Sequence, residues 1–544
     1  MSSKKIIALI LAALSLLALA ACGGKQNQSA QAPPQWTYPI PEPDYNAKLS
    51  LDFSPFEEAM ATLTDARRAE LDQFLATATI PEIQEKFQNG ELSSEELTIY
   101  YLDRIKRYDV DNFNSVLALN PQALDDARAR DAERANGQAG EMMHGIPVLL
   151  KNNIAIKGMT TAAGAVAMQD WKPDRDAAVT AALRDHGAVI LGHTNLSEWA
   201  NWMDLGMPNG FSALGGQTRN PYGPIDTLGS SSGSAVAAAA NFAVVTVGSE
   251  TQGSLLRPAN NNQAVALKPT HELVSGDYII PLMPFQDNAG PMARNVTDAV
   301  ILLSAMASSA TTPPPADVPA DLYEAARDRV KEGNLRLGMT APNEALQTAL
   351  EELGIEVVMM DSGDVPKSPP SASELLPPAF KAAINDFLPA VNAPVKSLEE
   401  IIAFNKEDMK NRAPYGQGHL LESQASDWSQ EKIDKAIQQR IKETDDKLTE
   451  IFDKYDVDVV LDTTNYIGVP MMQYYDAAGW PAMVLPIGFN DKGEPISLGF
   501  LARPYHEVDM LAAAALIESH IPTYSPPDLN ATIQMLDEKL GDKK

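Results

Sequence analysis

The sequence predicts an α/β fold in which helices cover both faces of one large β-sheet. Three observations carry this prediction. Short apolar runs recur along the chain and are flanked by glycine or polar turns. Alanine-rich and leucine-rich stretches with helical spacing alternate with these runs. Of the 544 residues, 44% are hydrophobic and 21% are charged, so the chain can bury a large core.

The predicted strands are the buried apolar runs. We expect them at 145–150, 188–191, 244–247, 335–339, 355–359, 457–461, 482–485 and 496–501.

The predicted helices follow capping signals or helical spacing. Ser93-x-x-Glu96 is a capping box, and Pro121 opens a second helix. The proline-rich segments 310–320 and 365–380 are expected to be loops or a lid. Further helices are expected at 177–183, 235–242 and 510–517, and within the charged stretch 396–455.

The first residues are typical of an export signal. Lys4 and Lys5 precede an uncharged apolar run at 6–21, which is short for a membrane span. The run leads into L-A-A-C at 19–22, which resembles a bacterial lipobox, and Cys22 is the single cysteine of the chain. We therefore expect a signal peptide at 1–21 and a lipidated Cys22, rather than a cysteine buried in the core. Because Gly23 and not aspartate follows, we expect a secreted bacterial lipoprotein of the outer membrane or cell surface.

The rest of the chain divides by composition. Residues 22–60 are expected to form a lipidated tether rich in proline and glutamine. Residues 61–530 are expected to be one catalytic domain, and residues 531–544 a charged C-terminal tail. The formal net charge of −29 argues against nucleic-acid binding, because phosphate backbones repel an acidic chain.

Three segments between residues 145 and 300 can carry chemistry. Lys151 ends a predicted buried strand, G-S-S-S-G-S at 229–234 opens an alanine-rich helix, and G-S-E-T-Q-G-S at 248–254 follows a predicted strand. Glycine-rich turns present backbone N–H groups that can stabilise an oxyanion. A desolvated lysine has a lowered pKa, so its neutral amine can serve as the base for a serine nucleophile. Taken singly, each segment also fits a structural role, as a snorkelling lysine, a helix cap or a turn.

Together the segments resemble the motifs of the amidase-signature family. G-I-P-V-x-x-K at 145–151 resembles its lysine motif, 228–234 its G-G-S-S-G-G-S element, and 248–254 its G-T-D/E-x-G/D-G-S element. Ser230 and Ser254 are 24 residues apart, the family's interval between its catalytic serines. Further similar blocks lie at 195–201, 215–221, 267–270, 288–292 and 479–482, and the first two look most like the peptide-amidase branch.

The resemblance implies an amidase that cleaves a carbon–nitrogen amide bond through an acyl-enzyme. Ser254 matches the nucleophile, Ser230 the bridging serine that follows a cis peptide bond, and Lys151 the base. The backbone N–H groups of Thr251, Gln252, Gly253 and Ser254 match the oxyanion hole. The family fold is an α/β/α sandwich around one large mixed β-sheet. No metal or cofactor is implied, and the substrate is a small-molecule or peptide amide, such as an uncharged primary amide at a peptide C-terminus.

The sequence departs from the family pattern in a few places. Asn152 stands where aspartate is usual, and Gln252 replaces glycine or aspartate beside the expected oxyanion hole. Arg257 lies three residues after Ser254, where many members have arginine two residues after. We expect Gln252 and Arg257 to affect substrate preference more than the chemistry.

Other functions stay open at this point. G-x-S-x-G at 229–233 also fits the nucleophile elbow of α/β-hydrolases, with Ser231 as the nucleophile of an esterase and His506 or His520 as its base. A non-catalytic surface lipoprotein that binds an amide is a second alternative. Within the family, the glutamine-hydrolysing subunit of the tRNA-dependent amidotransferase is a relative, but the lipobox and the acidic chain argue against it.

The first prediction concerns Cys22. Bacteria that express the full chain and are fed radioactive palmitate should label the wild-type protein and not Cys22→Ser, because the thiol is the attachment point. A Cys22→Ser protein that is processed and membrane-bound like the wild type would show that the anchor lies elsewhere.

Overall fold

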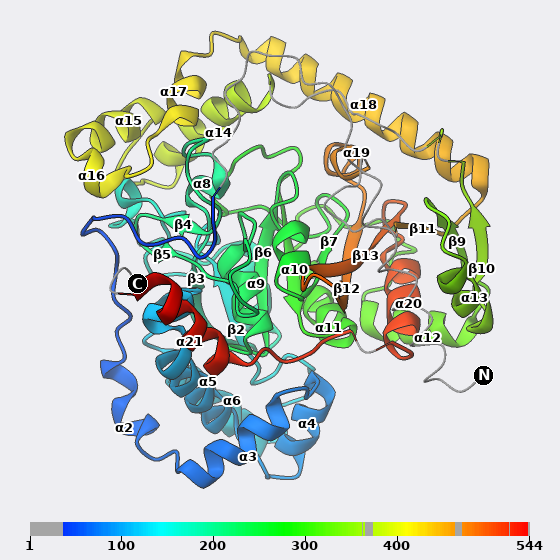
Figure 1. Cartoon of the computed structure of the whole chain (residues 1–544), viewed down its shortest axis with the longest axis horizontal. Helices are drawn as coiled ribbons and strands as arrows, with labels where there is room; N and C mark the ends of the chain where they lie inside the picture. The colour runs from blue at the N-terminus through cyan, green and yellow to red at the C-terminus, as the bar shows by residue number, and fades with distance from the viewer. Residues whose placement is uncertain (1–35, 362, 365–373, 463–470, 522, 542–544) are drawn as a thin grey trace.

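The computed structural model describes residues 36–361, 363–364, 374–462, 471–521 and 523–541 (Figure 1). Within these residues, eleven strands form one mixed sheet in the order β1-β3-β2-β6-β8-β7-β12-β13-β11-β9-β10. The strands are β1 Val116–Leu119, β2 Pro147–Lys151, β3 Val189–Thr194, β6 Val245–Glu250, β7 Val265–Lys268, β8 Asn288–Ala293, β9 Arg336–Met339, β10 Glu356–Met359, β11 Val459–Asp462, β12 Ala482–Phe489 and β13 Pro495–Ala502, and a separate hairpin pairs β4 Phe211–Ser212 with β5 Gly216–Gln217.

The helices flank this sheet and extend beyond it (Figure 1). They are α2 Glu57–Met60, α3 Asp65–Leu75, α4 Ile80–Gln88, α5 Ser94–Tyr108, α6 Ala123–Ala135, α7 Ala178–Asp185, α8 Glu198–Asn201, α9 Ser232–Ala239, α10 Leu256–Asn261, α11 Val296–Ala307, α12 Leu322–Glu332, α13 Glu344–Glu352, α14 Leu376–Ala390, α15 Leu398–Glu407, α16 Met409–Arg412, α17 Gly418–Ala425, α18 Gln430–Tyr455, α19 Met472–Ala478, α20 Glu507–Glu518 and α21 Leu529–Leu540.

Both faces of the sheet are buried, because alternate residues of its strands enter two different hydrophobic clusters. In β7, Val265 and Leu267 pack with α11 and α20, whereas Ala266 packs on the opposite face with α9, α10 and α18. The same alternation holds in β12, where Val484 faces away from Met483. The expected α/β/α arrangement around one large mixed sheet is therefore confirmed.

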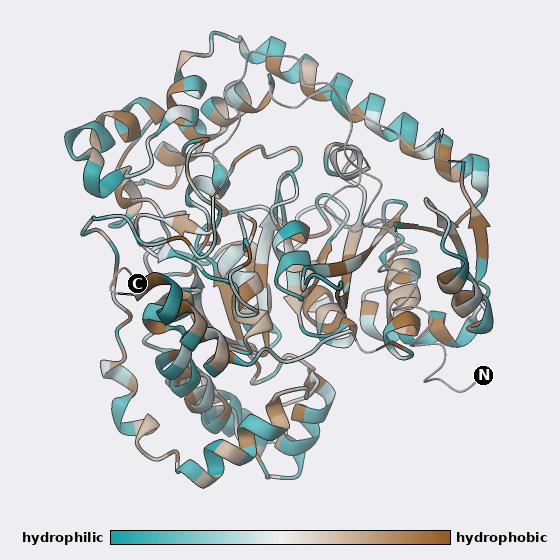
Figure 2. Ribbon diagram, viewed as in Figure 1, coloured by the Kyte–Doolittle hydropathy of each residue, from teal (hydrophilic) through white to brown (hydrophobic). Residues whose placement is uncertain are grey.

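The strands that the sequence predicted are all present, at most a few residues displaced. Three strands of the large sheet were not predicted as such, β1, β7 and β8, and neither was the β4–β5 hairpin. Each is short or interrupted by glycine, proline or polar residues, so its apolar pattern is weak. The charged stretch 396–455 is helical as expected, and Figure 1 shows α18 spanning the molecule from the α14–α17 group to the β9–β10 edge. Figure 2 shows mostly hydrophilic residues along α18, as expected of a helix with one buried stripe.

The expected tether is wrong for residues 36–60. Ile40, Phe53, Phe56 and Met60 are buried, and Glu42 accepts a hydrogen bond from the Gln217 backbone N–H at 2.9 Å. The segment forms no helix or strand up to residue 53, but its apolar side chains pack it on the catalytic domain. The signal segment 1–21, Cys22 and residues 23–35 lie outside the described residues.

The expected C-terminal tail is also wrong for most of its length. Residues 531–540 belong to α21, whose N-terminus is capped by Asp528 and whose Leu536 and Leu540 are buried. The charges of this segment lie on the outer side of an amphipathic helix, so its composition alone suggested a tail. Among the described residues, no helix is long and apolar enough to cross a membrane.

Candidate active site

The candidate site lies where two neighbouring parallel strands end. Lys151 is the last residue of β2, and β2 pairs in parallel with β6, which ends at Glu250. Helix α9 begins at the same edge of the sheet, because the Ser231 N–H donates to the Ser254 carbonyl at 2.8 Å. The carboxyl edge of the strands is where open α/β sheets place ligands. All three predicted segments therefore meet at one point.

The Lys151 amine is fully buried and surrounded by oxygen atoms. Its Nζ donates to Ser230 Oγ at 2.7 Å, to Ser249 Oγ at 2.8 Å and to Ser231 Oγ at 3.0 Å. The Ser249 carbonyl lies 3.3 Å away. No carboxylate among the described residues contacts the amine.

Burial lowers the pKa of Lys151 to about 7, although the nearby carboxylates of Glu250 and Asp287 act to raise it. Desolvation prevails because the carboxylates are not in contact with the amine, whereas the loss of water is complete. A lysine with this pKa is neutral in about half of the molecules at pH 7. Its free electron pair can then accept a proton, as expected of the base.

The Gly229–Ser230 peptide bond is cis, as the family resemblance implied. The Ser230 carbonyl accepts a hydrogen bond from the Ser197 N–H at 3.0 Å, and its hydroxyl faces Lys151. Ser230 is fully buried. Its hydroxyl therefore contacts Lys151, and the N–H of the next residue, Ser231, contacts the Ser254 carbonyl.

The Ser231 hydroxyl has three hydrogen-bond contacts, and Ser231 does not lie in the strand–turn–helix context of a nucleophile elbow. Its hydroxyl donates to the Ser249 carbonyl and accepts from the Ser249 N–H, both at 3.0 Å, in addition to its contact with Lys151. The side chain does not cap α9, and no strand directly precedes it. A Cβ on Gly248 would lie 2.8 Å from this hydroxyl, so glycine is needed for the approach. Ser231 thus joins α9 to β6.

Ser254 ends a tight turn between β6 and α10. Gly253 has a φ of +82°, which favours glycine, and Ser254 is nearly buried. Among the described residues its hydroxyl makes no hydrogen bond, so the link from Ser254 to Ser230 that the relay requires is not formed in this structure. Catalytic hydrogen bonds often form only once substrate is bound.

The Glu250 carboxylate stabilises this turn through hydrogen bonds with the backbone. Its Oε2 accepts hydrogen bonds from the backbone N–H groups of Leu255 and Leu256, at 3.1 Å for Leu256, and so anchors the start of α10. The Gly253 N–H also acts on the carboxylates of Glu250 and Asp476, opposing the rise of their pKa that burial causes. Four backbone N–H groups were expected to stabilise the oxyanion. The one of Gly253 therefore already faces carboxylate oxygens within the protein.

A buried charge network lies behind the turn. Lys268 of β7 is fully buried and lies near Glu250 and Asp476 of α19, whose negative charges oppose the lowering of its pKa to about 8 by burial. Asp476 was not found from the sequence, because it lies in a segment without a chemical motif. The network connects strands β6 and β7 to α19, which are distant in sequence.

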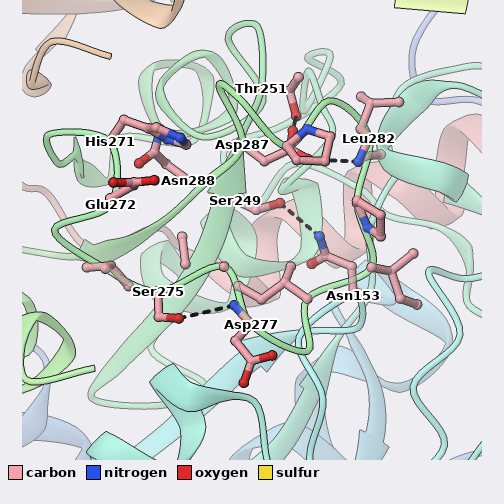
Figure 3. Close-up of a pocket in the computed structure, with 18 of the residues that line it drawn as sticks. Asn153, Ser249, Thr251, His271, Glu272, Ser275, Asp277, Leu282, Asp287 and Asn288 are labelled. Atoms are coloured by element: carbon pink, nitrogen blue, oxygen red, sulfur yellow. Dashed lines mark hydrogen bonds between the residues drawn. The ribbon is translucent and has the colours of Figure 1, made fainter. Parts of the chain in front are cut away.

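Two further side chains complete the surroundings of Ser249 (Figure 3). Asn153 Nδ2 donates to Ser249 Oγ at 3.1 Å. Asp287 accepts from the Thr251 hydroxyl at 2.6 Å and from the Leu282 and Met283 N–H groups at 2.8 Å. Neither side chain was singled out by the sequence. Their proximity depends on the folding of the 271–287 loop over the end of β6.

The two residues expected to affect substrate preference are half-buried near the turn. Gln252 Nε2 and Arg257 Nε have no hydrogen-bond partner in the described part of the chain. In that same part, no group of three His, Cys, Asp or Glu side chains has the arrangement of a metal site.

The sequence profile of the Amidase family matches residues 96–474, which include Lys151, Ser230 and Ser254. The chain belongs to the amidase-signature family.

Several known proteins of this family are similar over most of their length. A probable amidase of Arabidopsis thaliana is 31% identical, over 83% of this chain and 91% of its own. The structure of an amidase family protein from Bacillus anthracis has a TM-score of 0.79 at 31% identity, covering 90% of this chain and 100% of its own. The peptide amidase of Stenotrophomonas maltophilia has a TM-score of 0.76 at 34% identity, covering 83% and 99%.

The amidase is therefore a hydrolase that acts on amide carbon–nitrogen bonds. The α/β-hydrolase alternative is not favoured. His506 is exposed and lies 3.1 Å from Asp509, and the exposed His520 contacts Ser519 and the Leu516 carbonyl, so neither imidazole serves Ser231.

Proposed function

We propose that this amidase hydrolyses primary amides with Ser254 as nucleophile, Ser230 as proton bridge and Lys151 as base. The observation that carries the proposal is the fully buried Lys151 amine, 2.7 Å from Ser230 Oγ and with a pKa near 7. A lysine that only stabilised the fold would be expected to stay protonated beside a counter-ion.

In the first half of the reaction, Lys151 accepts the proton of Ser230 while Ser230 accepts the proton of Ser254. Ser254 Oγ then attacks the amide carbon, and the negative charge that develops on the carbonyl oxygen is stabilised by backbone N–H groups of the 251–254 turn. The proton returns through Ser230 to the leaving nitrogen. The carbon–nitrogen bond breaks, ammonia leaves, and an ester to Ser254 remains.

In the second half, water takes the place of the amine. Lys151 and Ser230 accept the proton of the water as it attacks the ester, and the proton then returns to Ser254 Oγ. The acid product leaves, and Lys151 is neutral again. The cycle requires a base that is unprotonated at working pH, which the desolvated amine supplies.

A peptide C-terminal amide is the substrate we propose. The support is the similarity to the peptide amidase of S. maltophilia, together with the blocks at 195–201 and 215–221. The first block packs beside the site, because the Ser197 N–H donates to the Ser230 carbonyl at 3.0 Å, and the second contacts the first, because Asn195 Nδ2 donates to the Gly216 carbonyl at 3.0 Å. We also propose that the enzyme is a surface lipoprotein held by Cys22, on the strength of the L-A-A-C sequence at 19–22.

The second prediction is a pH dependence. Below pH 7 Lys151 becomes protonated and cannot accept a proton, so kcat/KM should rise with pH through about 7 and then level off. Lys151→Ala should fold and lose about 10²- to 10⁴-fold in rate, whereas the exposed Lys157→Ala should keep full activity. A wild-type rate that does not change from acid to alkaline pH would rule out this base.

The third prediction separates Ser254 from Ser231. A fluorophosphonate probe should modify Ser254, as located by peptide mass mapping, because only that serine has a free hydroxyl beside the turn. Ser254→Ala should abolish labelling, whereas Ser231→Ala should only weaken it and lower the free energy of unfolding by about 1–3 kcal/mol, since buried Ser249 groups lose their partner. An adduct on Ser231 would instead support the esterase alternative, in which Ser231 is the nucleophile.

The fourth prediction concerns the bond that is cleaved. With peptide amides as substrates, ammonia should be released faster than any larger amine, because the proposed leaving group is ammonia. The check is an ammonia assay run beside chromatography of the peptide products. Faster cleavage of internal peptide bonds would contradict the proposal.

A further inference from the structure

A cavity of about 260 Å³ adjoins the site on the side of Ser249 and Thr251 (Figure 3). Its walls are the end of β6, Asn153 after β2, and the 271–289 segment between β7 and β8. It shares Ser249 with the surroundings of Lys151, whose amine is 2.8 Å from Ser249 Oγ. The volume is below that of sites for drug-sized ligands, about 300–1,000 Å³, and suits a single side chain.

One buried amide oxygen in the wall of this cavity lacks a partner. Asn153 Nδ2 donates to Ser249 Oγ at 3.1 Å, and Asn288 Nδ2 donates to the Gln286 carbonyl at 3.2 Å. These bonds leave Asn153 Oδ1 without a hydrogen-bond partner, although Asn153 is only 4% exposed, whereas the Asn288 side chain also interacts with the His271 imidazole. Figure 3 shows the two side chains on opposite sides of the cavity. Buried acceptors of this kind are normally satisfied, so a donor is missing.

The ionisable side chains of the wall are mostly acidic, and Glu272 and Asp277 are exposed to solvent. Asp287, Glu272 and Asp277 line the cavity, and no lysine or arginine does. Asp277 is paired with Arg175 at 2.6 Å, so its charge is already compensated. Glu272 makes no hydrogen bond or ion pair among the described residues, and its φ of +69° is a conformation that favours glycine. Its carboxylate is therefore free to receive a cation.

The neighbouring histidine does not neutralise this charge. His271 also lines the cavity, and burial together with Lys268 lowers its pKa to about 4, so its imidazole is uncharged near pH 7. The cavity thus combines an unpaired oxygen acceptor with carboxylates and without a cationic side chain in its wall. A group that carries several N–H donors and a positive charge satisfies both.

We propose that this cavity is a substrate subsite for an ammonium or guanidinium group on the acyl part of the amide. The assignment rests on the proposed function, because a primary amide releases ammonia and any larger group must belong to the acyl part. Preferred substrates are then amides of basic residues. This departs from the uncharged substrate that the sequence suggested, since the acidic wall forms only in the folded chain.

The test compares three N-acetyl amino-acid amides, of arginine, norleucine and glutamate, by their rates of ammonia release. The arginine amide should exceed the norleucine amide about tenfold or more in kcat/KM, mainly through KM, and the glutamate amide should be slowest. Added salt should reduce this preference, because it screens the charges at the mouth of the cavity.

Glu272→Gln removes the free carboxylate and nothing else. It should lower kcat/KM for the arginine amide several-fold and leave the norleucine amide unchanged. Glu58→Gln, an exposed carboxylate on α2 outside the cavity, loses the same charge and should change neither rate.

The outcomes separate the subsite from the proposed function. Equal rates for the arginine and norleucine amides, or an equal effect of Glu272→Gln on both, would overturn the subsite while Ser254-dependent hydrolysis remained. If none of the three amides were hydrolysed but larger amine-releasing amides were, the proposed function would fail first. A preference for the arginine amide that Glu272→Gln does not reduce would also overturn the assignment.

Discussion

The desolvated amine of Lys151 is the constraint on which the rest of the site depends. Burying an amine without a contacting counter-ion is unfavourable unless the amine is neutral or fully hydrogen-bonded. Here the oxygens of Ser230, Ser231 and Ser249 surround it, and these residues come from two different segments. The lysine therefore requires α9 to start against the end of β6. The contacts that stabilise the buried lysine also fix the distance between Lys151 and Ser230, two members of the proposed relay.

Small residues make this arrangement possible. Every residue of α9 is buried, and its sequence is serine, glycine, alanine and a single valine. A Cβ on Gly233 would lie 2.3 Å from the Asn195 carbonyl oxygen, so the helix start touches the backbone of the loop after β3. Larger side chains would hold α9 away from the sheet and separate Ser230 from Lys151. The alanine-rich composition of α9 thus reflects the close packing that brings Ser230 into contact with Lys151.

A second layer of charge supports the turn that carries Ser254. Glu250 binds the first N–H groups of α10, and it lies beside Lys268 and Asp476 in a region closed to water. Because uncompensated charges in such a region are costly, β6, β7 and α19 must assemble together. The network links this turn to α19, which is distant in sequence.

The sequence by itself determined the sheet's longer strands, the alternation of helices, and the set Lys151, Ser230 and Ser254. Each of these is encoded locally, in apolar runs and in glycine-rich turns with a defined spacing. Local sequence patterns did not predict β7 and β8, because their residues form strands only between neighbouring strands of the sheet. They also did not predict that residues 36–60 and 531–540 pack on the domain, because their apolar side chains are buried only by contact with distant parts of the chain. Only the tertiary structure decided that the Lys151 amine is buried away from water, that Asn153, Asp287 and Asp476 lie around the site, and that acidic side chains line the adjoining cavity. Burial and electrostatic fields are sums over segments far apart in the chain, so no single stretch of sequence contains them.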